Sequence, residues 1–329
     1  MTAAVSALYE PLIERDIARI PAAVRHFRRA HSSDDLFAAI GRFSILSYAP
    51  SQHARHAMLA SLAAYEMKDE LGERWDEALI ECAKYTAMSR QPWSEPPILE
   101  PPAFDVNDPC DITELRNAVA EHDRLRAERW LARRIDDPDL ADDYFLVASD
   151  DFADLGHKLI VATAAWKLAG LLGEKGRYAA LRIGVWEMVA YDGPPAMTGP
   201  GIDAAELLHG LIRWCVDEQG SIERAHAVFL FDSAVQALEI TRESMIYDRA
   251  AAHLADTRLG QTPSSVRTGE GACPPPVYSF GRDYAQYLKA CAVAKRLRSR
   301  FPDAPVGAFV AAAKYNLDHA PSFEEWSFA

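Results

Sequence analysis

Three histidines occupy the first turns of apolar helices that the sequence predicts: His56, His157 and His226. The unpaired backbone amides at a helix start carry a partial positive charge, which disfavours imidazolium and keeps the ring neutral. A neutral imidazole can bind a metal ion or accept a proton. Three of them suit iron, copper or zinc and leave coordination positions for water, oxygen or substrate. The sequence therefore predicts a metal site formed by these three side chains and assigns no separate catalytic residue.

Acidic residues lie just before the second of these histidines. Asp150, Asp151 and Asp154 are close enough in sequence to His157 to orient its second ring nitrogen or to act as a ligand. A structural role is the alternative, because a histidine at a helix start can also cap the helix or bond a neighbouring loop. The metal hypothesis requires that the three rings converge on one cavity, whereas the structural role does not.

The elements that must position these residues are helices. Across the 329 residues, apolar side chains recur at i, i+3, i+4 and i+7, and strand-like alternation is almost missing. The sequence therefore predicts an all-α protein, a helical bundle or array. The predicted helices are Ser33–Ser47, Ala54–Glu70, Trp75–Ser89, Ile112–Ile135, Leu140–Ala148, Gly156–Leu172, Arg177–Tyr191, Ala204–Val216, Ile222–Glu239, Ser244–Asp256, Arg282–Ser299 and Pro305–Asn316.

An internal repeat connects the histidines. When the sequence is aligned with itself so that His56 falls on His157, Leu71-Gly72-Glu73 falls on Leu172-Gly173-Glu174, and a weaker third copy begins at His226. Repeated hairpins must stack to cover their apolar faces, so one helical domain over 1–329 is expected. Its predicted parts are the repeats 34–92, 138–192 and 204–257 and a C-terminal helical pair, 282–316.

Four aromatic residues, two from each of the first copies, are expected in the core where the hairpins stack. They are Tyr65, Tyr85, Trp166 and Trp186. In each of these copies a glycine, Gly72 or Gly173, ends the apolar run, where a helix terminus can use positive φ.

Composition narrows the classes of partner. The chain has 35 basic and 48 acidic residues, a net charge of −13, which repels phosphate backbones and anionic headgroups. The basic run Arg124–Arg134 is interleaved with Glu128, Trp130 and Leu131, as on an amphipathic helix. Neither a nucleic acid nor a membrane is therefore an expected partner.

The compartment is predicted from cysteines and from the lack of targeting segments. The five cysteines are scattered and form no Cys-x-x-Cys pair, which indicates thiols in a reducing compartment. The first thirty residues contain no signal peptide, and no uncharged run of about 18 apolar residues could span a bilayer. A soluble cytoplasmic protein is expected.

Other catalytic signatures are missing from the sequence. It contains no Gly-x-Gly-x-x-Gly, no Walker-type lysine loop and no Gly-x-Ser-x-Gly. A classical nucleotide site, an ordinary dehydrogenase and a serine hydrolase are therefore not expected. Three stretches interrupt the helical pattern, Gln91–Pro109, Asp192–Gly201 and Arg258–Gly281, and the long proline-rich ones are candidate docking surfaces for a redox partner protein.

The run Asp154-Leu155-Gly156-His157-Lys158-Leu159-Ile160, with the alanine-rich helix after it, resembles an all-helical bacterial domain sometimes joined to Rieske iron–sulfur domains. More distantly, the chain is similar to questin-oxidase-like proteins. The second resemblance implies an oxygen-dependent oxidation of an aromatic polyketide. The chain has no Cys-x-His and Cys-x-x-His pair, so it cannot hold a Rieske cluster itself.

These observations predict an oxidoreductase of the oxygenase or oxidase type. Its histidine-lined cavity would hold a non-haem iron, copper or zinc ion, a small organic substrate, or both. The alternative is a non-catalytic helical scaffold or small-molecule-binding protein in which His56, His157 and His226 are structural.

Overall fold

The computed structural model describes residues 3–47, 52–89, 101–105, 107, 109–199, 201–217, 222–259 and 282–318, and these are helical with no β-strand among them. A single isolated bridge pairs Asp151 with Pro195 in this part of the chain. The all-α prediction is confirmed. The helices are α1 (Ala3–Glu14), α2 (Ile20–Arg28), α3 (Ser33–Leu46), α4 (Gln52–Glu66), α5 (Lys68–Leu71), the 3-10 turn η1 (Gly72–Arg74), α6 (Trp75–Ser89), α7 (Ile112–Ala120), α8 (Arg124–Arg134), α9 (Leu140–Ala148), α10 (Ala153–Leu172), α11 (Glu174–Ala190), α12 (Ala204–Asp217), α13 (Ile222–Thr241), α14 (Ser244–Leu259), α15 (Arg282–Arg300) and α16 (Val306–Asp318).

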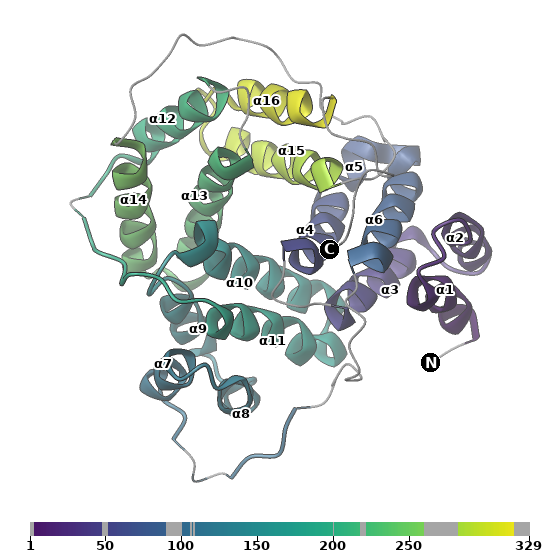
Figure 1. Ribbon diagram of the computed structural model, residues 1–329, viewed down its shortest axis with the longest axis horizontal. Helices are drawn as coiled ribbons and strands as arrows, with labels where there is room; N and C mark the ends of the chain where they lie inside the picture. Colours follow the sequence, from purple (N-terminus) through teal and green to yellow (C-terminus); the bar gives the residue numbers. More distant parts are fainter. Residues whose placement is uncertain are drawn as a thin grey trace. The chain divides into compact units, whose positions relative to one another are not determined.

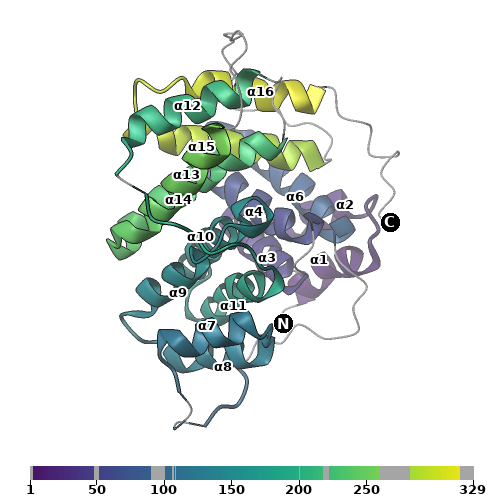
Figure 2. The ribbon, with the colours of Figure 1, turned by 60° about the vertical axis from the view of Figure 1, so that its left-hand side comes forward.

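The chain divides into two compact units, residues 1–97 with 270–295 and 310–329, and residues 98–269 with 296–309. In the first unit, α3, α4 and α6 pack on one another and α1 and α2 pack against α6 (Figure 1). In the second, α10 contacts α9, α11 and α13, and α13 in turn contacts α12 and α14 (Figures 1 and 2). Helices α4 and α6 pair in the first unit as α10 and α11 do in the second, but duplication of the hairpin stays a prediction.

Gly72 and Gly173 have the backbone conformation that the sequence predicted for them. Their φ angles are +54° and +67°, and each directly follows the last residue of a helix, Leu71 of α5 or Leu172 of α10. Side chains rarely adopt this left-handed region, which glycine enters without penalty. The two Leu-Gly-Glu runs therefore end their helices as expected.

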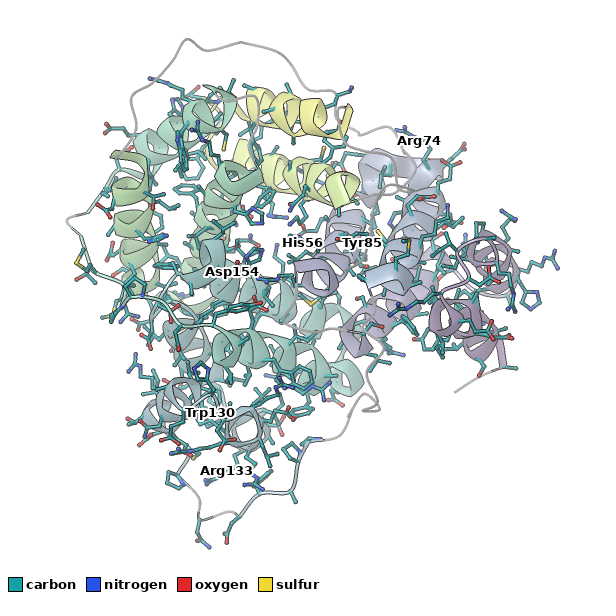
Figure 3. The ribbon with its side chains drawn as sticks, in the orientation of Figure 1. His56, Arg74, Tyr85, Trp130, Arg133 and Asp154 are labelled. Atoms are coloured by element: carbon teal, nitrogen blue, oxygen red, sulfur yellow. The ribbon has the colours of Figure 1, made fainter. Side chains whose placement is uncertain are left out.

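The prediction of one helix over Ile112–Ile135 is wrong, because two helices lie there. Helix α7 starts where expected, since Asp111 Oδ1 accepts the backbone N–H of Glu114 at 3.0 Å, but it ends at Ala120. His122 then has a left-handed φ of +54°, and Asp123 caps α8 by accepting the Arg126 N–H at 3.0 Å. The indole of Trp130, labelled in Figure 3, donates to the Asp111 carbonyl at 2.9 Å and holds α8 against α7. A second capping aspartate thus restarts the helix in a new direction.

Two N-terminal helices, α1 and α2, were not predicted from the sequence. Pro11 lies inside α1, and Pro21 lies in the first turn of α2, where its missing N–H costs nothing. Most of the large apolar side chains of these helices are buried, which stabilises the helices despite the prolines. The buried set includes Leu8, Leu12, Ile20, Val24 and Phe27.

The four repeat aromatics are only partly in the core. Tyr85 is fully buried, as predicted, whereas Tyr65, Trp166 and Trp186 are half-buried. Trp186 lies between two guanidinium groups, those of Arg124 and Arg182, at 4.5 and 4.6 Å from its ring. Its ring is therefore held by cation–π contacts as well as by apolar packing.

Basic side chains of α8 are paired with acidic residues, and the described cysteines are thiols. Arg126 on α8 forms ion pairs with Glu114 and Glu121, and Arg134 pairs with Asp137 and Asp143. None of the described cysteines, Cys82, Cys110, Cys215 and Cys291, forms a disulfide, and burial raises the pKa of the Cys82 and Cys215 thiols.

One of the three predicted interruptions is non-helical over Asp192–Gly199, as expected. Most of the other two, Gln91–Pro109 and Arg258–Gly281, lies outside the described residues, and so does Cys273. Among the described helices, none combines the length and the apolar character needed to cross a bilayer.

His122 at the α7–α8 break gives a testable titration. Its Nδ1 faces the Val189 carbonyl at 2.7 Å and its Nε2 faces Asp192 at 2.9 Å, and only imidazolium donates from both nitrogens. These contacts, the Val189 bond first, raise the pKa of His122 above its ordinary 6.5. The stabilisation is therefore complete at acid pH and is lost as pH rises through the raised pKa.

An NMR titration of the His122 ring is expected to give a midpoint above 6.5, with a lower midpoint in Asp192→Asn. A wild-type midpoint at or below 6.5 would contradict this geometry.

Candidate metal centre

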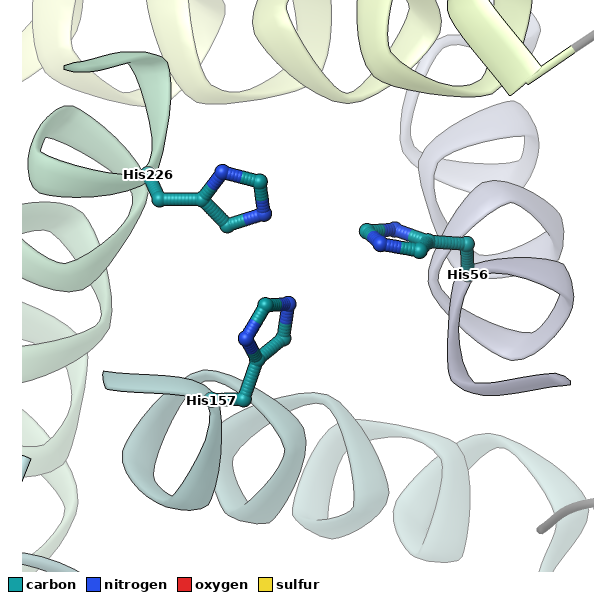
Figure 4. A group of neighbouring side chains, drawn as sticks. All are labelled: His56, His157 and His226. Carbon is teal, nitrogen blue, oxygen red and sulfur yellow. The ribbon is translucent and has the colours of Figure 1, made fainter. Parts of the chain in front are cut away.

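The structure brings together the three histidines that the sequence singled out. His56 and His226 are the fifth residues of α4 and α13, and His157 directly follows three left-handed residues at the start of α10; all three histidines are buried. Each offers one ring nitrogen, and these three atoms all lie within 4.8 Å of one another. Figure 4 shows the three rings pointing toward a common centre. The convergence that the metal hypothesis requires is present.

A glycine brings His157 against His226. The two imidazole rings lie 4.7 Å apart between centroids. Gly156 has a φ of +79°, and a Cβ atom placed on it would lie 2.7 Å from the Leu230 side chain. Leu230 follows His226 by one turn on the same face of α13. Because Gly156 has no side chain, the start of α10 can approach this face closely enough for the two rings to meet.

The backbone before His157 is strained. Asp154, Leu155 and Gly156 all have left-handed angles, with φ of 49°, 62° and 79°. Each of the first two residues costs about 1–2 kcal/mol in this region. Asp151 fixes the segment, since its carboxylate accepts the Ala153 N–H at 3.1 Å and the Lys158 ammonium at 2.6 Å. Strain of this kind persists where the surrounding contacts determine the conformation, and it is concentrated at functional sites.

This strained turn orients the His157 ring. The Nδ1 atom of His157 bonds the backbone carbonyl of Asp154, a group that can only accept. The Nδ1 atom therefore carries the hydrogen and the lone pair is on Nε2, as assigned from the bond partner. A carbonyl on the second ring nitrogen is the usual arrangement for a metal-binding histidine.

His56 has a different partner. Lys289 on α15, a buried residue, places its Nζ 2.9 Å from the Nδ1 of His56. An ammonium group can only donate, so Nδ1 accepts and the hydrogen of the neutral ring lies on Nε2. His56 can bind an ion only when Lys289 gives up this bond or becomes its acceptor. A lysine in this position competes with a metal ion for His56.

The three aspartates before His157 have different partners. Asp150 pairs with Arg116 and Arg249 at 2.7 and 2.9 Å, and Asp151 binds Lys158. Only Asp154 reaches His157, with a carboxylate oxygen 3.7 Å from Nδ1. The group of candidate ligands in the described residues therefore consists of three imidazoles and no carboxylate.

This ligand set defines the chemistry that is possible. Three nitrogens bound to one ion at about 2.0–2.1 Å lie roughly 3.3 Å apart in a tetrahedral site, so the rings must move inward to bind it. Neutral imidazoles do not reduce the charge of a divalent ion in this buried place, and the Asp154 carboxylate beside His157 would offset only part of it. Hydroxide or an anionic ligand in the fourth position would supply the missing charge.

No family model matches this chain, and no curated protein or solved structure matches it. The residues of the site therefore carry the functional argument alone. The resemblance of the chain to the Rieske-linked helical domain and to questin-oxidase-like proteins stays a prediction.

Sequence reasoning missed Lys289 and the packing role of Gly156. Lys289 is in a helix that the repeat analysis placed outside the histidine-bearing copies. A signal was present, because Gln286 and Lys289 are polar residues three apart within the otherwise apolar run from Ala285 to Ala294. Two polar residues on one face of a buried helix require partners.

Gly156→Ala tests the close approach of α10 to α13. The variant is expected to lose about 1–3 kcal/mol of unfolding free energy, because alanine is strained at positive φ and its Cβ contacts Leu230. Gly170→Ala is the control in the same helix, since nothing lies within 4 Å of its Cβ and alanine favours a helix by about 0.5–1 kcal/mol. Urea denaturation measures both, and equal stabilities for the two variants would contradict this packing.

Proposed function

We propose that His56, His157 and His226 bind one metal ion, iron, copper or zinc, and that the protein is an oxidoreductase for a small organic molecule, for which iron or copper held by these residues would supply the redox couple. The observation that carries the proposal is the convergence of three buried ring nitrogens within 4.8 Å. Three buried histidines on three separate helices offer a ligand set that needs an inward shift of the rings and the release of His56 from Lys289 to bind an ion. The ion supplies Lewis acidity and, for iron or copper, a redox couple.

The oxidoreductase assignment has narrower support than metal binding. Three protein ligands leave coordination positions open, as in catalytic rather than structural metal sites. The resemblance to questin-oxidase-like proteins implies dioxygen as the electron acceptor and an aromatic compound as the electron donor. A redox partner protein is the alternative source of oxidising or reducing equivalents.

Duplication would explain how two of the ligands arose. His56 lies in the first turns of α4 and His157 follows the left-handed residues at the start of α10. The first histidine segment ends at Leu71 of α5 and the second at Leu172 of α10, and each end is followed by a glycine with positive φ and a glutamate. We infer that both histidines derive from one ancestral hairpin, with His226 from a third, shorter copy. A repeated histidine becomes a shared site when the copies stack.

A second candidate function follows from the contact between Lys289 and His56. An ammonium beside the ring suits a hydrogen-bonded polar cluster without metal, in a scaffold or small-molecule-binding protein. In that case the three histidines contribute to stability and to ligand contacts. Metal analysis and stability measurements on two variants separate the candidates.

His157→Ala is the first test. Untagged wild-type protein, loaded with Fe²⁺, Cu²⁺ or Zn²⁺ and desalted, is expected to retain about one ion per chain by elemental analysis. The variant should retain less than about a tenth of that, because two remaining imidazoles bind weakly. His253→Ala is the matched control, a half-buried histidine whose ring lies 4.9 Å from that of Phe152, and should retain the ion. Loss of helical circular dichroism would invalidate the comparison, and a wild type without bound metal favours the second candidate.

Lys289→Met is the second test. Methionine preserves the length and apolar stem of the lysine but removes the donor and the positive charge. Metal affinity is expected to rise on the order of tenfold, because the competing bond and the repulsion between cations are both removed. Isothermal titration with Zn²⁺ measures the change. Unchanged affinity with a lower melting temperature would indicate the metal-free cluster instead.

A further inference from the structure

Gln286 on α15 is a buried amide with unsatisfied hydrogen-bonding groups. Its side chain is 6% exposed, and neither its oxygen nor its nitrogen has a hydrogen-bond partner among the described residues. Leaving a buried polar group unsatisfied costs about 1–3 kcal/mol. By contrast, the amide nitrogen of Gln236, an equally buried glutamine on α13, donates to Asp232 at 2.6 Å. Other buried side chains, Gln236 among them, have one polar atom without a partner in the described residues, but both polar atoms of Gln286 lack one, which requires a physical explanation.

The position of Gln286 places it beside the histidine site. It precedes Lys289 by three residues, so the two side chains are neighbours on one face of α15. The Lys289 Nζ contacts His56 Nδ1 at 2.9 Å, and all three residues belong to the first unit. The unsatisfied amide thus lies next to the lysine that contacts a candidate ligand.

The chemistry of these groups specifies what can bind. The amide of Gln286 offers two N–H donors and one acceptor oxygen, while Lys289 offers a positive charge with donors only. A ligand that satisfies both side chains has an anionic oxygen for the lysine. It also has an adjacent hydroxyl or carbonyl group for the amide. An uncharged hydrocarbon would leave the amide unsatisfied.

We propose that Gln286 and Lys289, beside His56, form the binding subsite for a small organic anion, a carboxylate or phenolate flanked by a hydroxyl or carbonyl group. The assignment of this anion as the substrate rests on the proposed function, while its binding does not. The charge supports the same class of ligand, because the Lys289 ammonium and a divalent ion on neutral imidazoles both attract an anion.

Salicylate is the probe, since it carries a carboxylate next to a hydroxyl group. Its affinity is measured by isothermal titration on the full-length chain after treatment with EDTA, so that coordination to metal makes no contribution. Gln286→Met keeps the volume but removes the hydrogen bonds, and is expected to weaken binding about tenfold. Gln286→Glu should weaken binding further, because a carboxylate repels the probe.

Thermal unfolding without the probe separates a ligand-binding amide from a structural one. Gln286→Met should melt at the wild-type temperature or higher, because it removes an unsatisfied buried group. Gln236→Met is the matched control and should melt lower, with unchanged affinity for salicylate, since it loses the bond to Asp232. If a bound water satisfied Gln286 as part of the fold, its methionine variant would also melt lower.

Equal affinity for salicylate in wild type and Gln286→Met would overturn the proposal. So would a lower melting temperature for that variant, or no binding by the wild type up to about 10 mM. The metal content of the same preparations is measured before EDTA treatment. If the wild type binds metal but has the same salicylate affinity as Gln286→Met, only the subsite is refuted. If the two proteins differ in salicylate affinity but the wild type binds no metal, only the metal centre is refuted.

Discussion

The close approach of α10 to α13 at Gly156 is the constraint on which the rest of the site depends. A side chain there would occupy the place of Leu230, one turn from His226, and would separate the two rings. The chain reaches this geometry through three consecutive left-handed residues, two of which are not glycine. Such a conformation reduces stability, and the surrounding bonds of Asp151 hold it in place. The unfavourable backbone conformation therefore occurs next to the convergent histidines. Strained residues are expected there when the local structure serves a functional site.

Much of the fold could be predicted from the sequence, because helical periodicity is a local property. The boundaries that failed have identifiable causes. The segment from Ile112 to Ile135 keeps its apolar period through a break, so periodicity alone could not reveal that Asp123 caps a second helix. Helices α1 and α2 contain prolines that conceal them, and tertiary burial of their apolar faces stabilises them. In both cases the sequence pattern was ambiguous and long-range packing determined the outcome.

The site could be predicted in part, because the repeat placed His56 and His157 in matching positions. Their convergence with His226 depends on how helices pack, which the sequence pattern does not encode. The same limit applies to Lys289, whose contact with His56 joins residues more than 200 positions apart. A buried lysine or glutamine in an apolar helix indicates that a partner exists, but only the three-dimensional arrangement identifies it. The Asp154 carbonyl was also out of reach of sequence reasoning, which favoured the carboxylates for orienting His157.

The charges around the three histidines determine what the site can accept. Neutral imidazoles and a lysine provide no negative charge, so the Asp154 carboxylate, 3.7 Å from Nδ1 of His157, would offset only part of the charge of a divalent ion bound there. Asp150 and Asp151 cannot compensate it, since their carboxylates already serve Arg116, Arg249 and Lys158. The rest of the counter-charge would come from outside the protein, as hydroxide or as an organic anion. An anion that binds Lys289 would also weaken the hold of this lysine on His56 and so favour coordination of the ion. Metal and anion are therefore expected to bind cooperatively, because each removes an electrostatic cost of the other.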